Sequence, residues 1–207
     1  MKLFERFDKV YCVNLDKRSD RLLNFNQLVE TYDLGNYVRV SAVDGSTINN
    51  STKLSNGELG LIMSNLNIIN EAISERLDKI LIIEDDCFFT SEINNVDAYF
   101  NLLPNDWDML YMGGNHNTHV GVNPPIKIND KVVKLHSTYS THFVGIKSTV
   151  FEHIKIILES KKHPIDVAYT QLQKIFNVYS FTPAIAKQIK DYSDIQNKIT
   201  DYDWLIT

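Results

Sequence analysis

The strongest constraint on the fold is a short apolar run that ends in three consecutive acids. Residues 79–83 read Lys-Ile-Leu-Ile-Ile, and residues 84–86 read Glu-Asp-Asp. A short, uninterrupted apolar run rich in isoleucine predicts a strand that is buried on both faces, as in a parallel sheet. The acids would then lie at the carboxyl end of a central strand.

Strand and helix patterns alternate on both sides of this run. Ser55 and Glu58 have the capping-box spacing of a helix start. The alternation of strands and helices predicts an α/β protein with a mostly parallel central sheet flanked by helices. The other strands are expected at residues 9–15, 37–40 and 108–112, and the helices at residues 18–32, 55–77 and 96–103.

The second half of the chain has a different pattern. Residues 113–130 are polar and rich in Gly, Asn and Pro, which predicts a loop or lid. One or two strands are expected within residues 132–146, followed by helices near residues 148–160 and 166–176. Because no repeat or linker interrupts the 207 residues, we expect a single domain.

Composition excludes some functions. The net charge is −5, and the 21 Lys and Arg residues are scattered among 26 acids, which argues against a nucleic-acid partner. No signal peptide or transmembrane run is evident, so we expect a cytoplasmic protein, with peripheral attachment to a membrane left open. Cys12 and Cys87 are expected to be free, half-buried thiols in a reducing compartment.

The three acids suggest a metal site. Clustered carboxylates repel one another, and a divalent cation would remove that cost. Strand alternation would point Glu84 and Asp86 to one side and Asp85 to the other. Mg²⁺ or Mn²⁺ is typically held by one or two carboxylates together with water and substrate phosphates. The alternative is a solvated acidic turn after a strand.

Two other enzyme classes also place acids at strand ends. Phosphatases of the haloacid dehalogenase type and response-regulator receiver domains both carry them on the first strand. Here the first strand ends in Asn14-Leu15-Asp16, and about two strand–helix units precede Glu84. Both classes therefore fit poorly.

Four motifs lie at residues 10–21, 41–45, 57–64 and 81–86, and weaker ones lie at residues 108–111, 141–146, 164–166 and 193–195. In this order along most of the chain, they resemble glycosyltransferase family 25. This family includes bacterial lipooligosaccharide galactosyltransferases and collagen galactosyltransferases. One departure is Asn65, because the family commonly has Ser-His where this chain has Ser64-Asn65. That departure supports the alternative of a non-catalytic, glycosyltransferase-like protein that binds a carbohydrate or a nucleotide.

The resemblance implies a Rossmann-like domain of the GT-A type. It also implies a UDP-sugar donor, Mn²⁺ or Mg²⁺, and transfer with inversion at the anomeric carbon. The sugar would be galactose or glucose, and the acceptor a hydroxyl on a glycan, glycolipid or protein, as in lipopolysaccharide biosynthesis. Residues 1–112 would form the nucleotide-sugar-binding half and residues 113–207 the acceptor-binding half.

Site residues follow from the same resemblance. Asp86 is expected to bind the metal, with His142 as a further ligand, although a lone strand histidine is often structural. Arg18 and Arg21 offer forked donors to base or phosphate, or else are solvated residues of a first helical turn. Asp44-Gly45 would line the nucleoside pocket or simply form a turn. The expected nucleotide-sugar contacts are Val13, Asn14, Leu15, Arg18, Arg21, Asp44, Gly45, Ser64, Glu84 and Asp85.

An inverting transfer also needs a base for the acceptor hydroxyl. Asp166 is the candidate, because it follows Pro164-Ile165 as in the family pattern. The alternative is a structural role, since an Asp at the start of a predicted helix is a natural N-cap. Trp107, Tyr111 and Trp204 could stack on a sugar or pack in the core.

Overall fold

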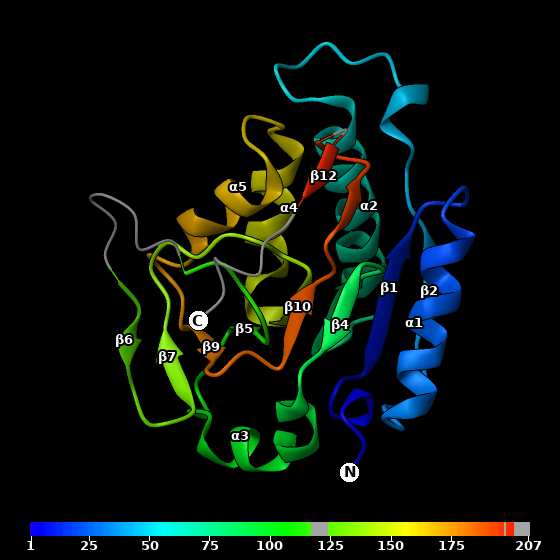
Figure 1. Cartoon of the computed structure of the whole chain (residues 1–207). Helices are drawn as coiled ribbons and strands as arrows, with labels where there is room; N and C mark the ends of the chain where they lie inside the picture. Colours follow the sequence, from blue (N-terminus) through cyan, green and yellow to red (C-terminus); the bar gives the residue numbers. More distant parts are fainter. Residues whose placement is uncertain (117–123, 197, 201–207) are drawn as a thin grey trace.

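The computed structural model describes residues 1–116, 124–196 and 198–200. Its centre is an eight-stranded sheet of order β2-β1-β3-β8-β5-β9-β7-β6 (Figure 1). Its strands are β1 (Lys9–Asn14), β2 (Val38–Ser41), β3 (Lys79–Glu84), β5 (Met109–Tyr111), β6 (Ile126–Lys127), β7 (Val132–Lys134), β8 (Phe143–Lys147) and β9 (Val178–Phe181).

The sheet is mostly parallel in strand direction. β1 pairs in parallel with β2 and β3, and β9 pairs in parallel with β5. β8 is antiparallel to both β3 and β5, so β3 and β5 run the same way. β7 is antiparallel to β9 and to β6. Six of the eight strands therefore share one direction and only β7 and β8 oppose it, which confirms the expected Rossmann-like architecture.

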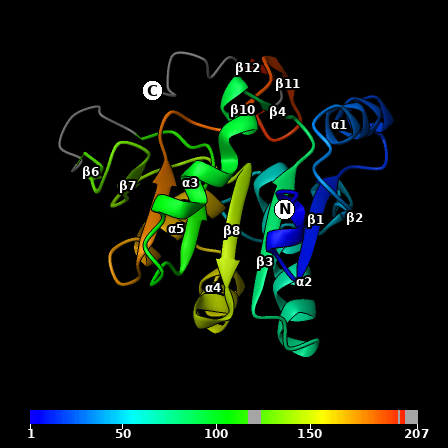
Figure 2. The same ribbon diagram turned by 90° about the horizontal axis from the view of Figure 1, so that it is seen from below.

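Helices cover both faces of the sheet, and Figure 2 shows α2 and α4 on the face opposite α1 and α3. Buried side chains of α2, α4 and α5 join one apolar cluster, and Phe25 of α1 and Tyr99 of α3 join the other. Ser55 caps α2 in the expected capping box with Glu58. The α-helices are α1 (Ser19–Thr31), α2 (Asn56–Ser74), α3 (Val96–Leu102), α4 (Phe151–Glu159) and α5 (Ile165–Leu172), and the 3-10 helices are Phe4–Arg6, Gly45–Thr47, Ser91–Asn95 and Ser148–Val150.

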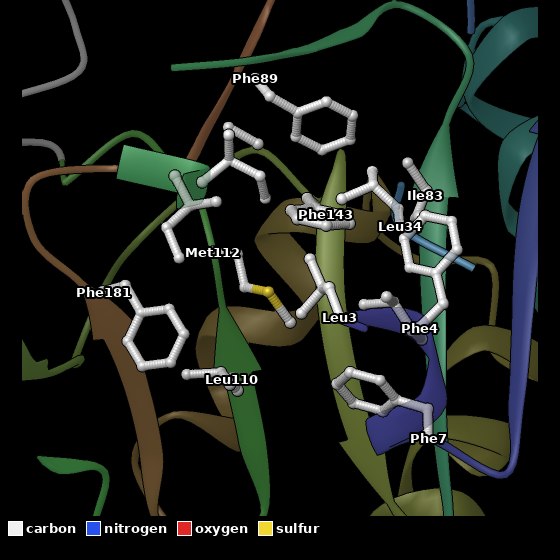
Figure 3. Packing of buried hydrophobic residues seen from close by; sticks show 14 of the residues in the cluster. Leu3, Phe4, Phe7, Leu34, Ile83, Phe89, Leu110, Met112, Phe143 and Phe181 are labelled. Atoms are coloured by element: carbon white, nitrogen blue, oxygen red, sulfur yellow. The ribbon is translucent and has the colours of Figure 1, made fainter. Parts of the chain in front are cut away.

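The cluster under α1 and α3 is rich in aromatic side chains (Figure 3). Phe89 packs edge-to-face on Phe143, with ring centroids 5.6 Å apart, and Phe7 lies against Phe100 in the same manner at 6.4 Å. Cys12 and Cys87 are free, and both are fully buried and not half-buried as expected. This packing fixes β3 and β8 side by side and so holds the acid motif in place.

Two small sheets lie outside the central one. β4 (Cys87–Phe89) pairs with β10 (Ala186–Gln188), and β11 (Asp191–Ser193) pairs with β12 (Lys198–Thr200). None of these four strands was expected from the sequence, nor were β6 and β9. Among the described residues, no helix combines the length and apolar character needed to cross a bilayer.

Candidate functional site

A cavity of about 460 Å³ opens at the carboxyl ends of β1, β2 and β3. This volume lies in the range of small-molecule sites, and the position is where ligands bind in such sheets. The cavity lining includes eleven of the expected site residues, namely Val13, Leu15, Arg18, Arg21, Asp44, Gly45, Ser64, Glu84, Asp85, Asp86 and Asp166. The structure therefore brings together residues from positions 13 to 166.

The acid motif does not alternate as expected. β3 ends at Glu84, and Asp85 and Asp86 form a turn. Nη1 of Arg21 lies 3.3 Å from Oδ1 of Asp85 and 3.2 Å from Oδ2 of Asp86, so these two acids share one guanidinium. Glu84 instead accepts a hydrogen bond from Oγ1 of Thr141 at 3.2 Å. The strand ends two residues before Asp86, so strand alternation does not pair Glu84 with Asp86 opposite Asp85.

Asn14 lies beneath the cavity and holds Asp85. Its Nδ2 donates to Oδ2 of Asp85 at 2.6 Å, and its Oδ1 accepts from Nε of Arg39 at 2.9 Å. Only 1% of Asn14 is exposed. Asn14 is not part of the cavity lining, and its hydrogen bond positions Asp85.

Burial and mutual repulsion raise the pKa of two acids of the motif, Glu84 and Asp85. Burial, followed by the charges of Asp86 and Asp85, raises the pKa of Glu84 to about 8. Burial raises the pKa of Asp85 to about 6, although the hydrogen bond from Asn14 opposes that shift. The motif is thus an electrostatically unfavourable cluster that a bound cation would relieve.

The donor set of the motif fits a hard cation that takes most of its ligands from water and phosphate. Oδ1 of Asp86 is buried and has no hydrogen-bond partner within the described residues. In the same part of the chain, no three His, Cys, Asp or Glu side chains form a complete metal cage. Carboxylate oxygens supplemented by a phosphorylated ligand suit Mg²⁺ or Mn²⁺.

His142 lies near Asp86 but is not part of the cavity lining. The residue is fully buried, and its Nε2 lies 3.4 Å from the carbonyl oxygen of Ala186. Burial lowers its pKa, against the effect of the Asp86 charge. Its Nδ1, like Oδ1 of Asp86, is buried and has no hydrogen-bond partner within the described residues. The strand position placed it near Asp86 but did not determine which way the ring points.

Basic residues face the acids from α1 and the loop before it. Arg18 pairs with Asp191 and Asp194, each at 2.8 Å, and Arg21 pairs with Asp191 at 3.0 Å. Arg18 and Arg21 are therefore not solvated residues of a helical turn. Asp191 gave no sequence signal, whereas Asp194 lies in one of the weaker family matches, residues 193–195.

The wall opposite the acids is formed by the 3-10 turn at Gly45 and by α2. A Cβ on Gly45 would lie 1.7 Å from the carbonyl oxygen of Asn56, so only glycine permits this approach. Oγ of Ser64 accepts from the backbone N–H of Val43 at 2.9 Å. Asn65 donates back to the Leu61 carbonyl and is not part of the cavity lining.

Asp166 lies in the first turn of α5 and faces the cavity. The N-cap position is held by Pro164, and Oδ1 of Asp166 accepts from the N–H of Val167 at 2.8 Å. Burial raises the pKa of Asp166, against backbone hydrogen bonds that include one from Ser140. Ser140 and Thr141 thus connect Asp166 and Glu84, which face the same space.

Two of the three aromatic residues considered for sugar stacking lie in the apolar core. Tyr111 is fully buried and Trp107 is 8% exposed, and both belong to the apolar clusters. Neither is part of the cavity lining. Trp204 and residues 117–123 of the expected lid lie outside the described residues.

Comparisons with known proteins agree with the motif order. A family described as Glycosyltransferase family 25 (LPS biosynthesis protein) matches residues 7–178. Procollagen galactosyltransferase 1 of Danio rerio is 30% identical over 130 residues, which cover 52% of this chain and 21% of that protein. Procollagen galactosyltransferase 2 of Homo sapiens is 29% identical over 133 residues, with the same shares covered. The matched region thus spans about a fifth of these curated relatives.

Solved structures resemble the chain more distantly. A glycosyltransferase involved in glycosylation of the major capsid of PBCV-1 aligns with a TM-score of 0.45 and 13% identity, over 74% of this chain and 65% of that one. The protein A197 from STIV aligns with a TM-score of 0.46 and 15% identity, over 93% and 94% of the two chains.

Proposed function

The chain belongs to glycosyltransferase family 25, and we propose that it transfers a hexose, galactose or glucose, from a UDP-sugar to a hydroxyl group. The observation that carries the proposal is the meeting of the acid motif, Arg18, Arg21 and Asp166 in one cavity. Basic groups suit a diphosphate, and a carboxylate at a separate part of the wall suits an acceptor hydroxyl. Galactosyltransferase relatives and the family assignment support the same reaction class.

The nucleoside would lie between the end of β1 and the 3-10 turn. Val13 and Leu15 supply apolar surface on one side, and Asp44 and Gly45 lie across the cavity. Oδ1 of Asp44 accepts from the Ser46 N–H at 2.9 Å, so its side chain is already oriented. Such fixed, mixed surfaces are typical of cofactor and nucleotide pockets.

Asp86 would hold Mn²⁺ or Mg²⁺, and the ion when bound would neutralise charge on the leaving diphosphate. The residues of the chain would position the sugar around it. Asn14 and Arg21 fix Asp85, and Thr141 fixes Glu84. Two oriented carboxyl groups can then bind hydroxyls of the sugar or ribose.

Asp166 would act as the base. It would take the proton of the acceptor hydroxyl while the acceptor oxygen attacks the anomeric carbon and the bond to the diphosphate breaks. Attack on the face opposite the leaving group inverts the anomeric centre. Burial raises the pKa of Asp166, and a more basic carboxylate accepts the proton more readily. The acceptor, a glycan, glycolipid or hydroxylated protein, would approach from the side of Ser140 and Pro164.

A screen of UDP-hexoses with Mn²⁺ tests the proposal, with sugar release and transfer followed by mass spectrometry. We expect UDP-galactose or UDP-glucose to be consumed. Binding of UDP without turnover of any UDP-sugar would favour the non-catalytic alternative. Absence of both binding and turnover would contradict the proposal.

A further inference from the structure

The β11–β12 hairpin covers one side of the cavity. Its two strands pair with each other and form a sheet separate from the central one. Ile195, between the two strands, lies against Gly57 in the first turn of α2. Ser193, Asp194, Ile195 and Thr200 belong to the cavity lining. The hairpin therefore borders the same space in which we place the donor.

Ion pairs hold the hairpin to the basic residues of the cavity. Nη2 of Arg18 lies 2.8 Å from Oδ2 of Asp191, and Nη1 of Arg18 lies 2.8 Å from Oδ2 of Asp194. Nη2 of Arg21 lies 3.0 Å from Oδ2 of Asp191 and donates to the Tyr192 carbonyl at 2.7 Å. Nζ of Lys17 is 3.4 Å from Oδ1 of Asp194. Two hairpin carboxylates thus bind three cations.

These bonds, together with further bonds to acids outside the hairpin, occupy the N–H donors of the Arg18 and Arg21 guanidinium groups. Arg18 also donates from Nε and Nη2 to Asp20, and Arg21 also donates from Nη1 to Asp85 and Asp86. A phosphate needs the same N–H groups, because guanidinium recognises phosphate and carboxylate with the same forked geometry. A diphosphate can therefore bind either arginine directly only if one of these carboxylates first leaves its contact with that arginine.

We propose that Asp191 and Asp194 occupy the place of the donor diphosphate, so that the β11–β12 hairpin is an internal competitor of the nucleoside diphosphate. Binding of the nucleotide exchanges the carboxylates for phosphates and releases the hairpin from the cavity. This rests on the proposed function of the site. Negative charge on the hairpin and on the ligand repel each other, which makes simultaneous binding to the same cations unfavourable.

The contact of the hairpin with α2 is close but small. A Cβ on Gly57 would lie 2.5 Å from Cα of Ile195. Backbone therefore packs directly on backbone at this point. The contact offers a way to displace the hairpin without changing its charge, because Gly57→Ala would force Ile195 away while favouring the helix at that position.

Calorimetry with UDP, with and without Mn²⁺, tests the exchange in the full chain. We expect the double variant Asp191→Asn, Asp194→Asn to bind UDP about tenfold more tightly than the wild type, because the competing state is weakened. Hydrogen exchange of the β11 and β12 amides should rise in the variant without ligand, and in the wild type when UDP is added. Gly57→Ala should raise the same exchange without ligand.

Asp20→Asn is the matched control. It removes the same charge from Arg18, but Asp20 belongs to α1 and not to the hairpin. We expect hairpin exchange in this variant to stay at the wild-type level. The competition would be overturned if the double variant bound UDP no more tightly than the wild type. It would also be overturned if UDP slowed hydrogen exchange of the hairpin in the wild type. Either result would leave the proposed function intact. If neither the wild type nor any variant bound UDP, the proposed function would be contradicted, and so would the competition that rests on it.

Discussion

Asn14 donates a 2.6 Å hydrogen bond to Asp85, so the end of β1 holds an acid at the end of β3. The bond is buried, and it connects the two strands on which the cavity is built. Parallel strands bring their carboxyl ends to one edge of a sheet, which is why residues 71 positions apart meet here.

Asn14→Ala should reduce both stability and donor binding. Asp85 would lose a buried hydrogen bond, at a cost of about 1–3 kcal/mol in the free energy of unfolding. UDP affinity should fall several-fold because Asp85 would be free to rotate. Urea unfolding and calorimetry measure the two effects. Asn94→Ala, at an exposed site, should change neither; unchanged UDP binding by Asn14→Ala would contradict the positioning role.

Asp86→Ala should abolish transfer, with a loss of at least about 100-fold, because the proposed cation loses its ligand. A chelator should have the same effect on the wild type, and added Mn²⁺ should reverse it. Asp33→Asn, which removes the charge of an exposed acid paired with Lys2, is the control. Turnover that survives either the chelator or the Asp86 substitution would remove the metal from the mechanism.

Asp166→Asn should lower the rate of transfer by about 100-fold or more while UDP affinity stays near that of the wild type, because the amide cannot accept the acceptor proton. The initial rate at saturating donor and the calorimetric Kd separate these effects. Asp130→Asn, at an exposed ion pair with Lys127, should be neutral. Loss of stability without loss of rate would instead indicate a purely structural role at the start of α5.

His116 should make the folded protein sensitive to acid. Burial lowers its pKa to about 4, so between pH 6.5 and 4 the unfolded state binds more protons than the folded state. Stability due to this residue is therefore present above pH 6.5 and is lost as the pH falls towards 4. His116→Gln should remove part of that loss, on the order of 1–3 kcal/mol.

Urea unfolding at pH 7.5 and pH 4.5 measures the difference between wild type and His116→Gln. The exposed His163→Gln provides the control, because the side chain is solvated in both states. An equal acid-induced loss of stability in wild type and His116→Gln would show that the histidine is not buried in its neutral form.

Much of the fold was predictable from local patterns. The isoleucine-rich run at β3, the capping box of α2 and the strand–helix alternation each depend on neighbours in sequence. The reversal of β8 and the short strands β4, β9 and β10 depend on partners far along the chain. Their sequences are too short to carry a period of their own.

The site was predictable as a set of residues but not as a set of contacts. Family motifs led to Asp86 and Asp166, and the structure places both in the cavity lining. The sequence did not show that the Arg21 guanidinium binds two acids of the motif as well as the hairpin. These contacts depend on where β3 ends and on where Asp191 lies. The direction of the His142 ring likewise depends on packing against Ala186.

A crystal structure of the protein with Mn²⁺ and UDP tests the central claim most directly. We expect the diphosphate beside Asp86, Arg18 and Arg21, with the uracil end near Gly45. A nucleotide bound elsewhere on the molecule, with the carboxylates of residues 84–86 in contact with solvent alone, would contradict the account.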